Sequence, residues 1–185
     1  MSVVLEERLI TVEEYYRMAE VGILGPDEKV ELINGKIINM SPIGSKHAYC
    51  VKQLNKIFIA LFGDTHTIGI QDPIRLSDLS EPEPDLSLAL GPDSKYIESH
   101  PSPSDILLLI EVADSSVDED RDVKIPLYAS SGIPECWIVN IPENKIEVYK
   151  SPKHNTYQLK EEYLPGQSIS LQNLKATIQV NQILP

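Results

Sequence analysis

Glu111 is the first residue that suggests chemistry, because it ends an otherwise apolar run, Ile106-Leu-Leu-Leu-Ile110. An unpaired carboxylate there would cost several kcal/mol by desolvation, so something must compensate its charge. A structural ion pair, an exposed strand end and a bound cation all remain open for this residue taken alone.

Asp85 repeats the pattern, because it follows Pro84 and opens the apolar run at residues 86–90. Read by itself it could equally be a turn residue in an acidic loop. Two acids at the edges of adjacent core strands can share a hard cation, and Mg²⁺ typically takes one or two carboxylates with water and phosphate. Asp85 and Glu111 therefore form a candidate metal site.

Lys124 supplies a candidate cation for the same site. Proline is tolerated only in the first helical turn, so Pro126 predicts a helix that begins near residues 120–123. Lys124 would then lie at the positive end of the helix dipole, where a cation needs carboxylates or phosphate opposite it. An exposed lysine beside Asp120 and Asp122 is the alternative, and Tyr128 should share its helix face.

Glu31 and His47 are weaker candidates from the N-terminal half. Glu31 could add a metal or water ligand, and His47 a phosphate contact or a proton carrier. The alternatives are a solvated glutamate in a hairpin strand and a histidine satisfied within the core.

The elements that must position these residues mix helices, hairpins and strands. Thr11 and Glu14 form a capping-box pattern, and Asn34-Gly35 suits a two-residue hairpin turn. His47, Val51, Leu54, Phe58 and Leu61 form one inward-facing helical stripe. The expected helices cover residues 11–19, 45–62 and about 120–131, and the expected strands cover residues 30–33, 36–38, 66–76, 86–90, 106–112, 135–140, 145–150, 157–163 and 177–183.

The strand at residues 106–112 is expected in the middle of the sheet, because its apolarity is continuous rather than alternating. With 185 residues and no visible linker, residues 1–185 are expected to form one α/β or α+β domain. A loop is expected over residues 91–103.

Charge and composition restrict the possible functions. The chain has a net charge of -12, which opposes non-specific attraction to phosphate, although acidic residues in two short windows could be neutralised by a divalent ion. No apolar run is long enough to cross a membrane, and the first ten residues lack a secretory signal pattern, so a cytoplasmic protein is expected. Cys50 and Cys136 are isolated and expected to be buried.

Taken together, the motifs resemble the Uma family of "putative restriction endonucleases", a group abundant in cyanobacteria within the PD-(D/E)XK nuclease superfamily. The resemblance covers Thr11 to about Val148. Its motifs are Glu31-Leu-Ile-Asn-Gly35, His47, Pro84-Asp85, Glu111-Val112, Asp122-x-Lys124-x-x-x-Tyr128 and Gly132-Ile-Pro-Glu-Cys-Trp-Ile-Val139.

The resemblance implies a mixed β-sheet flanked by helices, with Asp85 and Glu111 as the two acids. Ala113 occupies the usual position of the lysine, so Lys124 from the following helix would replace it. The Val112 carbonyl would also reach the metal. The chain departs from the family at residues 113–116, Ala-Asp-Ser-Ser instead of a Ser-Pro-Ser stretch, and at Cys136 and Asn140, where Tyr and Asp are common.

The resulting hypothesis is hydrolysis of DNA phosphodiesters with Mg²⁺ or Mn²⁺ at Asp85, Glu111 and Val112. Lys124 would orient or deprotonate the attacking water, or stabilise the pentacovalent charge, with Glu31 and His47 completing the catalytic site. The alternatives are a non-catalytic nuclease-fold binding protein and a hydrolase of smaller phosphate esters. A homodimer is expected if both strands of a duplex are cut.

Overall fold

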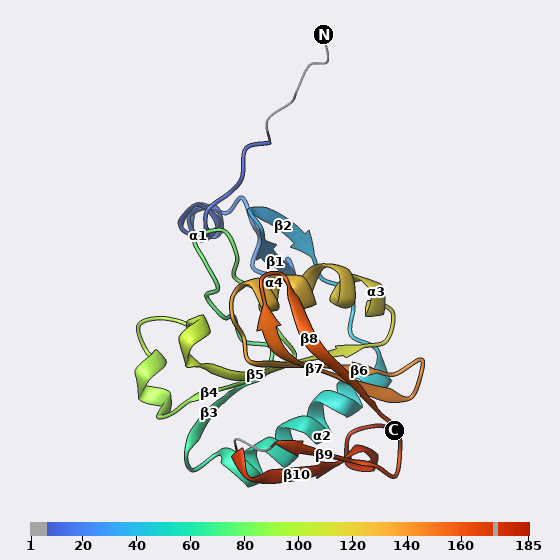
Figure 1. Cartoon of the computed structure of the whole chain (residues 1–185). Helices are drawn as coiled ribbons and strands as arrows, with labels where there is room; N and C mark the ends of the chain where they lie inside the picture. The colour runs from blue at the N-terminus through green and yellow to red at the C-terminus, as the bar shows by residue number, and fades with distance from the viewer. Residues whose placement is uncertain (1–6, 172–173) are drawn as a thin grey trace.

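The computed structural model describes residues 7–171 and 174–185, and its central feature is a six-stranded sheet (Figure 1). The sheet has the order β3-β4-β5-β6-β7-β8, in which β5 and β6 are parallel and every other neighbouring pair is antiparallel. The strands are β3 (His66–Gly69), β4 (Leu86–Leu90), β5 (Ile106–Ala113), β6 (Glu135–Asn140), β7 (Lys145–Lys153) and β8 (Thr156–Tyr163). The expected mixed sheet with a central strand at β5 is thus confirmed. Residues 1–6, part of the segment examined for a secretory signal, lie outside the described residues.

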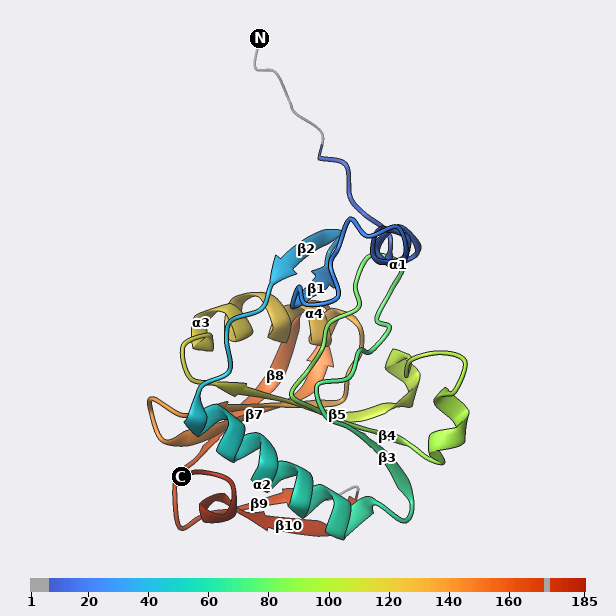
Figure 2. The same ribbon diagram turned by 180° about the vertical axis from the view of Figure 1, so that it is seen from behind.

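Both faces of the sheet are covered, as Figures 1 and 2 show from opposite sides. The long helix α2 (Ser45–Phe62) and the small pair β9 (Ser168–Leu171) and β10 (Ala176–Gln179) lie on one face. The hairpin β1 (Val30–Ile33) and β2 (Lys36–Asn39) lies on the other face with α3 (Val117–Glu119), η3 (Asp120–Lys124) and α4 (Ile125–Ser130). The remaining elements are α1 (Val12–Glu20), η1 (Asp93–Tyr96), η2 (Pro103–Asp105) and η5 (Val180–Gln182).

Strand β5 is apolar on both sides because it faces two cores. Its alternating residues Leu108, Ile110 and Val112 pack into the core beneath α2. Leu109 and Ala113 pack into the core beneath α4. Since side chains alternate along a strand, Glu111 points toward α4.

The N-terminal predictions are confirmed in detail. Thr11 caps α1 and exchanges hydrogen bonds with Glu14 in a capping box. Asn34 and Gly35 adopt φ values of 50° and 74°, which a two-residue hairpin turn requires. The expected helix over residues 45–62 agrees with α2, and both cysteines are buried.

Two details of the core were predicted wrongly. Leu61 is 46% exposed, and Phe62 is buried in its place, because the stripe continues from Phe58 by four residues. The strand expected over residues 66–76 ends at Gly69, since the chain turns at Gln71, which has a φ of 55°, and crosses toward the hairpin.

The structure also differs from expectation near the C-terminus and in the loop of residues 91–103. The expected final strand ends at Gln179 and continues as η5, while β9 was not predicted. The loop contains η1. In the described ranges, no helix is long and apolar enough to cross a membrane.

The helix that carries Lys124 begins earlier than Pro126 suggested. Helical conformation starts at Val117, and residues Asp120–Lys124 form a π-helical turn before α4. A π turn is rare and is often found at functional sites. Pro126 follows this turn, where the regular α-helical hydrogen bonding that its missing N–H would break is already interrupted.

Candidate active site

Asp85 lies immediately before β4 and is held by three donors. Its carboxylate accepts hydrogen bonds from the Val112 main-chain N–H at 2.8 Å and from Gln71 Nε2 at 3.0 Å, and its Oδ2 lies 3.1 Å from His47 Nε2. Leu86 pairs with Ile110, so extending this register by one residue places Asp85 beside Glu111. The structure therefore brings the two predicted acids together at neighbouring strands.

Glu111 is 3% exposed and faces the helical segment above β5. It accepts a hydrogen bond from the Tyr128 hydroxyl, and its carboxylate lies 3.4 Å from Lys124 Nζ. Burial raises the pKa of Glu111 well above its usual value, more than the Lys124 ammonium lowers it. A further positive charge near Glu111 would therefore be favourable.

Lys124 ends the π turn with its ammonium among carboxylates. Its Nζ lies 3.2 Å from Glu31 Oε1 and 3.4 Å from Glu111. Burial by itself would lower the pKa of Lys124, but Glu111, Glu31 and Asp120 raise it above the usual lysine value. Lys124 is consequently an ammonium at neutral pH in this environment.

Glu31 is buried on β1 rather than solvated. Its second carboxylate oxygen accepts a 3.0 Å hydrogen bond from the Glu83 main-chain N–H, which fixes the side chain toward Lys124. Burial, followed by the charge of Glu31, raises the pKa of Glu83. The β1–β2 hairpin, which is not part of the central sheet, therefore places the Glu31 carboxylate in the site.

His47 lies in the first turns of α2 and joins the site through Asp85. Among the described residues, its buried Nδ1 has no hydrogen-bond partner. Burial would lower the pKa of His47, but the hydrogen bond and charge of Asp85 raise it overall, assisted by Asp114 and Asp120. A protonated His47 would have one N–H available for a ligand.

These side chains line one cavity of about 490 Å³. All five predicted catalytic residues contribute to its wall, as does Val112. The acidic residues of the wall outnumber the lysines by eight to two; the acids are Glu28, Glu31, Glu83, Asp85, Glu111, Asp114, Glu119 and Asp120, and the lysines are Lys29 and Lys124.

Three further residues belong to the site, beyond the catalytic set taken from the sequence. Gln71 orients Asp85, Tyr128 binds Glu111, and Asp120 is 4% exposed with a hydrogen bond from Ser116 Oγ. Burial raises the pKa of Asp120 to about 6. The spacing of Asp120, Lys124 and Tyr128 by four residues each is the signal for a shared helical face, whereas nothing in the sequence marked Gln71.

The donor set fits a hard divalent cation. In residues 7–171 and 174–185, no three Asp, Glu, His or Cys side chains converge as a complete cage. Mg²⁺ does not require one, since one or two carboxylates with water and substrate oxygens satisfy it. The paired Asp85 and Glu111, the excess of acids and the raised pKa of Glu111 all favour added positive charge.

A mixed sheet flanked by helices, with acids at two neighbouring strands and a lysine from the helical segment across them, has the architecture of a nuclease-like fold. The chain belongs to the Uma2 family, described as "Putative restriction endonuclease", whose model matches residues 12–181. The family resemblance expected from the motifs is confirmed.

The fold is also that of a solved structure, a "putative nuclease belonging to DUF820" from Anabaena variabilis ATCC 29413. The two share 15% sequence identity with a TM-score of 0.70, over 94% of this chain and 97% of the other. No curated protein matches the chain.

Proposed function

We propose that this protein is a divalent-metal-dependent endonuclease that hydrolyses DNA phosphodiester bonds. The observation that carries the proposal is the convergence of Asp85, Glu111 and Lys124, from three separate segments of the chain, on one cavity. Membership of a family of restriction endonuclease type supports the same activity.

Asp85, Glu111 and the main-chain carbonyl of Val112 would hold Mg²⁺ or Mn²⁺. Such an ion polarises a phosphoryl oxygen and lowers the pKa of water. Val112 links the two carboxylates of this proposed ligand set, because it follows Glu111 in the chain and its main-chain N–H donates a hydrogen bond to Asp85. His47, at the same carboxylate oxygen as the Val112 N–H, and Gln71, at the other oxygen, keep the Asp85 carboxylate in its orientation.

Lys124 contributes positive charge. Its neighbouring carboxylates oppose loss of the Nζ proton, so we favour orientation of the attacking water and stabilisation of developing negative charge over a role as base. Glu31 holds Nζ in place, and His47 donates a hydrogen bond to the substrate phosphate.

Titration calorimetry with Mg²⁺ and Mn²⁺, followed by a DNA cleavage assay on the same samples, tests the proposal. Asp85→Asn and Glu111→Gln should each weaken ion binding and abolish cleavage, because each removes one of the two carboxylates. Asp93→Asn is the matched control, since Asp93 is exposed in η1, away from the cavity wall. Full activity in Glu111→Gln would disprove the assignment, and absence of ion binding in the wild type would favour the non-catalytic alternative.

A smaller substrate is the second candidate. The eight acids around the cavity and the net charge of -12 disfavour a long duplex more than a nucleotide or a short single strand. Parallel assays with plasmid DNA, short oligonucleotides and a nucleotide phosphodiester distinguish the two. Cleavage confined to the small substrates would replace the endonuclease proposal.

The proposed assembly is a homodimer of single-domain chains, since a two-fold pair can address both strands of a duplex. Light scattering with and without a DNA duplex measures this directly. A monomer in both conditions would contradict it.

A further inference from the structure

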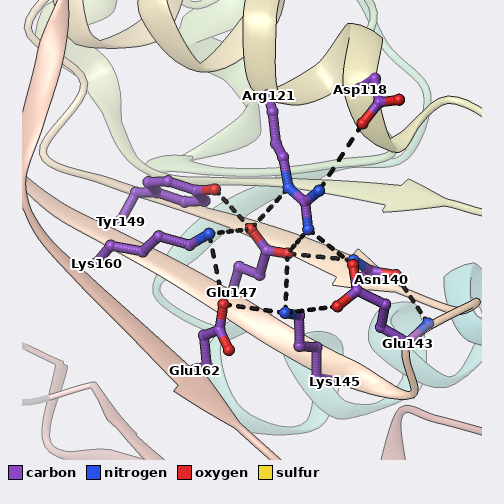
Figure 3. Close-up of polar contacts among 9 residues, drawn as sticks. All are labelled: Asp118, Arg121, Asn140, Glu143, Lys145, Glu147, Tyr149, Lys160 and Glu162. Carbon is purple, nitrogen blue, oxygen red and sulfur yellow. Dashed lines mark hydrogen bonds and ion pairs between the residues drawn. The ribbon is translucent and has the colours of Figure 1, made fainter.

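Glu147 is a buried carboxylate that lies outside the cavity wall and is not used in the proposed chemistry. Glu147, in the middle of β7, has a side chain that is 0% exposed. Figure 3 shows it surrounded by donors from three directions: the helical segment above it, its own strand and hairpin, and strand β8. Its polar partners are Arg121, Asn140, Lys145, Tyr149 and Lys160.

Arg121 is the only one of these partners that the helical segment contributes among the described residues. Its guanidinium makes a two-point contact with Glu147, in which Nε binds Oε2 at 3.1 Å and Nη2 binds Oε1. Nη2 also binds Glu143 at 3.1 Å. A forked Arg–carboxylate contact fixes orientation as well as distance, which a lysine contact does not.

Glu147 and Glu111 lie in one row across the sheet. Glu111 pairs with Ile138 of β6, and Ile138 pairs with Glu147 of β7. Residues that pair across a sheet share a face, so both acids point toward the same helical segment, about 10 Å apart. Ile138 lies between them and is fully buried.

The π turn contacts this row at both acids. Arg121 and Lys124, three residues apart in η3, bind Glu147 and Glu111 respectively. Lysine has a long flexible side chain, so the position of Nζ depends on where the turn is held. The turn has the wider π-helical hydrogen bonding in place of the α-helical pattern, so contacts to the sheet help to define its position.

The surroundings of Glu147 favour its ionised form. Although burial would raise the pKa of Glu147, its hydrogen bonds to Arg121, Tyr149, Lys160 and Asn140 lower it below the usual glutamate range. The same contact raises the pKa of Arg121. Removing one partner of a buried, hydrogen-bonded ion pair leaves the other charge uncompensated, which is strongly unfavourable.

We propose that Glu147, acting through Arg121, is a positioning residue that fixes the turn Asp120–Lys124 on the sheet and so holds Lys124 Nζ at Glu111. The inference rests on the proposed nuclease function for its effect on rate. The anchoring of the turn can be measured separately.

Kinetics of Glu147→Gln and Arg121→Gln test the effect on rate. The kcat for DNA cleavage should fall about 10- to 100-fold, since small misplacement of a catalytic group has effects of that size. The KM for DNA should change by less than about twofold, and Mn²⁺ affinity should be retained, because the proposed ligands are unchanged. Arg121→Lys should restore part of the rate.

Lys160→Gln is the matched control. Lys160 Nζ binds the same carboxylate, 2.9 Å from Glu147 Oε2, but comes from β8, and its ion pairs are with Glu147 and Glu162 rather than with a residue of η3. This variant should lower thermal stability and keep kcat within about twofold of the wild type. Equal rate losses in Lys160→Gln and Glu147→Gln would overturn the proposal, as would full activity in Glu147→Gln.

Amide hydrogen exchange tests the anchor without any cleavage assay. Exchange over residues 120–124 should become faster in Glu147→Gln than in Lys160→Gln, while exchange in β6 stays unchanged. Equal exchange rates over that turn would overturn the anchoring. A wild type that cleaves no DNA would instead disprove the proposed function, and the exchange result would still decide the anchor.

Discussion

At the scale of single residues, the site is defined by an excess of carboxylates over cations. Lys124 is the only buried lysine among the described residues, and it contacts Glu31 and Glu111 at once. Asp120 adds a third acid nearby, with its pKa raised to about 6 by burial. The metal-free protein therefore keeps unfavourable negative charge in the cavity, which a divalent ion would relieve.

Asp120→Asn should stabilise the metal-free protein at pH 8. Because the pKa of Asp120 in the folded protein, about 6, lies above its ordinary value of 3.8, ionised Asp120 destabilises the fold at high pH, and this cost disappears as pH falls below 3.8. The gain in unfolding free energy should be about 1–3 kcal/mol at pH 8, fall to about 0.5 kcal/mol near pH 4 and vanish at lower pH. Urea denaturation in EDTA measures it.

Asp122→Asn is the control for this comparison, because Asp122 is exposed in the same turn. It should change the unfolding free energy by less than about 0.5 kcal/mol. A destabilised Asp120→Asn at pH 8 would show that Asp120 is favourably compensated, contrary to the prediction.

Substitution of Lys124 tests whether its charge or its proton transfer matters. Arginine keeps the charge and cannot act as a base near neutral pH. If charge is the contribution, Lys124→Arg should retain measurable cleavage, whereas Lys124→Gln should lose about 100-fold or more in kcat. Single-turnover rates across pH 6–9 measure both, and equal loss in the two variants would favour proton transfer.

At the scale of elements, strand and hairpin patterns predicted most of the fold. The turn residues Asn34-Gly35 predicted the hairpin, and the continuous apolarity of residues 106–112 predicted the central strand, because each pattern is typical of one kind of structure. Asp85, Glu111 and Lys124 were found partly from these edges and partly from the family resemblance. The structure places all three at one cavity.

The unpredicted features depend on contacts between distant segments. Glu147 alternates with Ile146 and Val148, which reads as a solvent-facing position of a strand until a helix covers that face. Asp120 and Arg121 were given no role from the sequence, because nothing within the helical segment marks a residue that the sheet will contact. The π turn was missed because Pro126 also fits the first turn of a regular helix.

The hairpin depends on Gly35, which gives an element-scale prediction. A Cβ on Gly35 would lie 2.5 Å from Leu9 Cβ, with φ at +74°. Gly35→Ala should therefore lose about 1 kcal/mol for the left-handed backbone and about 1–3 kcal/mol for overpacking. Urea denaturation measures the change.

Gly166→Ala provides the comparison. Gly166 has a φ of +91°, and a Cβ there would meet nothing within 4 Å, so only the backbone cost should appear. Equal losses in the two variants would show that the segment around Leu9 moves aside without cost. A larger loss of unfolding free energy in Gly35→Ala, with reduced cleavage in that variant alone, would show that the hairpin determines the position of Glu31.

At the scale of the whole molecule, the net charge of -12 and the acidic cavity must be reconciled with the polyanionic substrate that we propose. A divalent ion at Asp85 and Glu111 would convert a repulsive cavity into one that accepts a phosphate. The protein is thus expected to bind DNA only together with its ion, unlike a basic protein that binds phosphate without help.

Fluorescence anisotropy with a labelled duplex and the Lys124→Gln variant, whose slow cleavage would leave the DNA intact, measures this dependence. We expect negligible binding in EDTA and about tenfold or greater tightening with Mg²⁺, because the ion neutralises part of the cavity. At fixed Mg²⁺, affinity should fall steeply with added KCl if several phosphates are contacted. A flat salt dependence would identify a site for one phosphate group and favour the smaller substrate, whereas equal binding with and without Mg²⁺ would place the DNA away from Asp85 and Glu111.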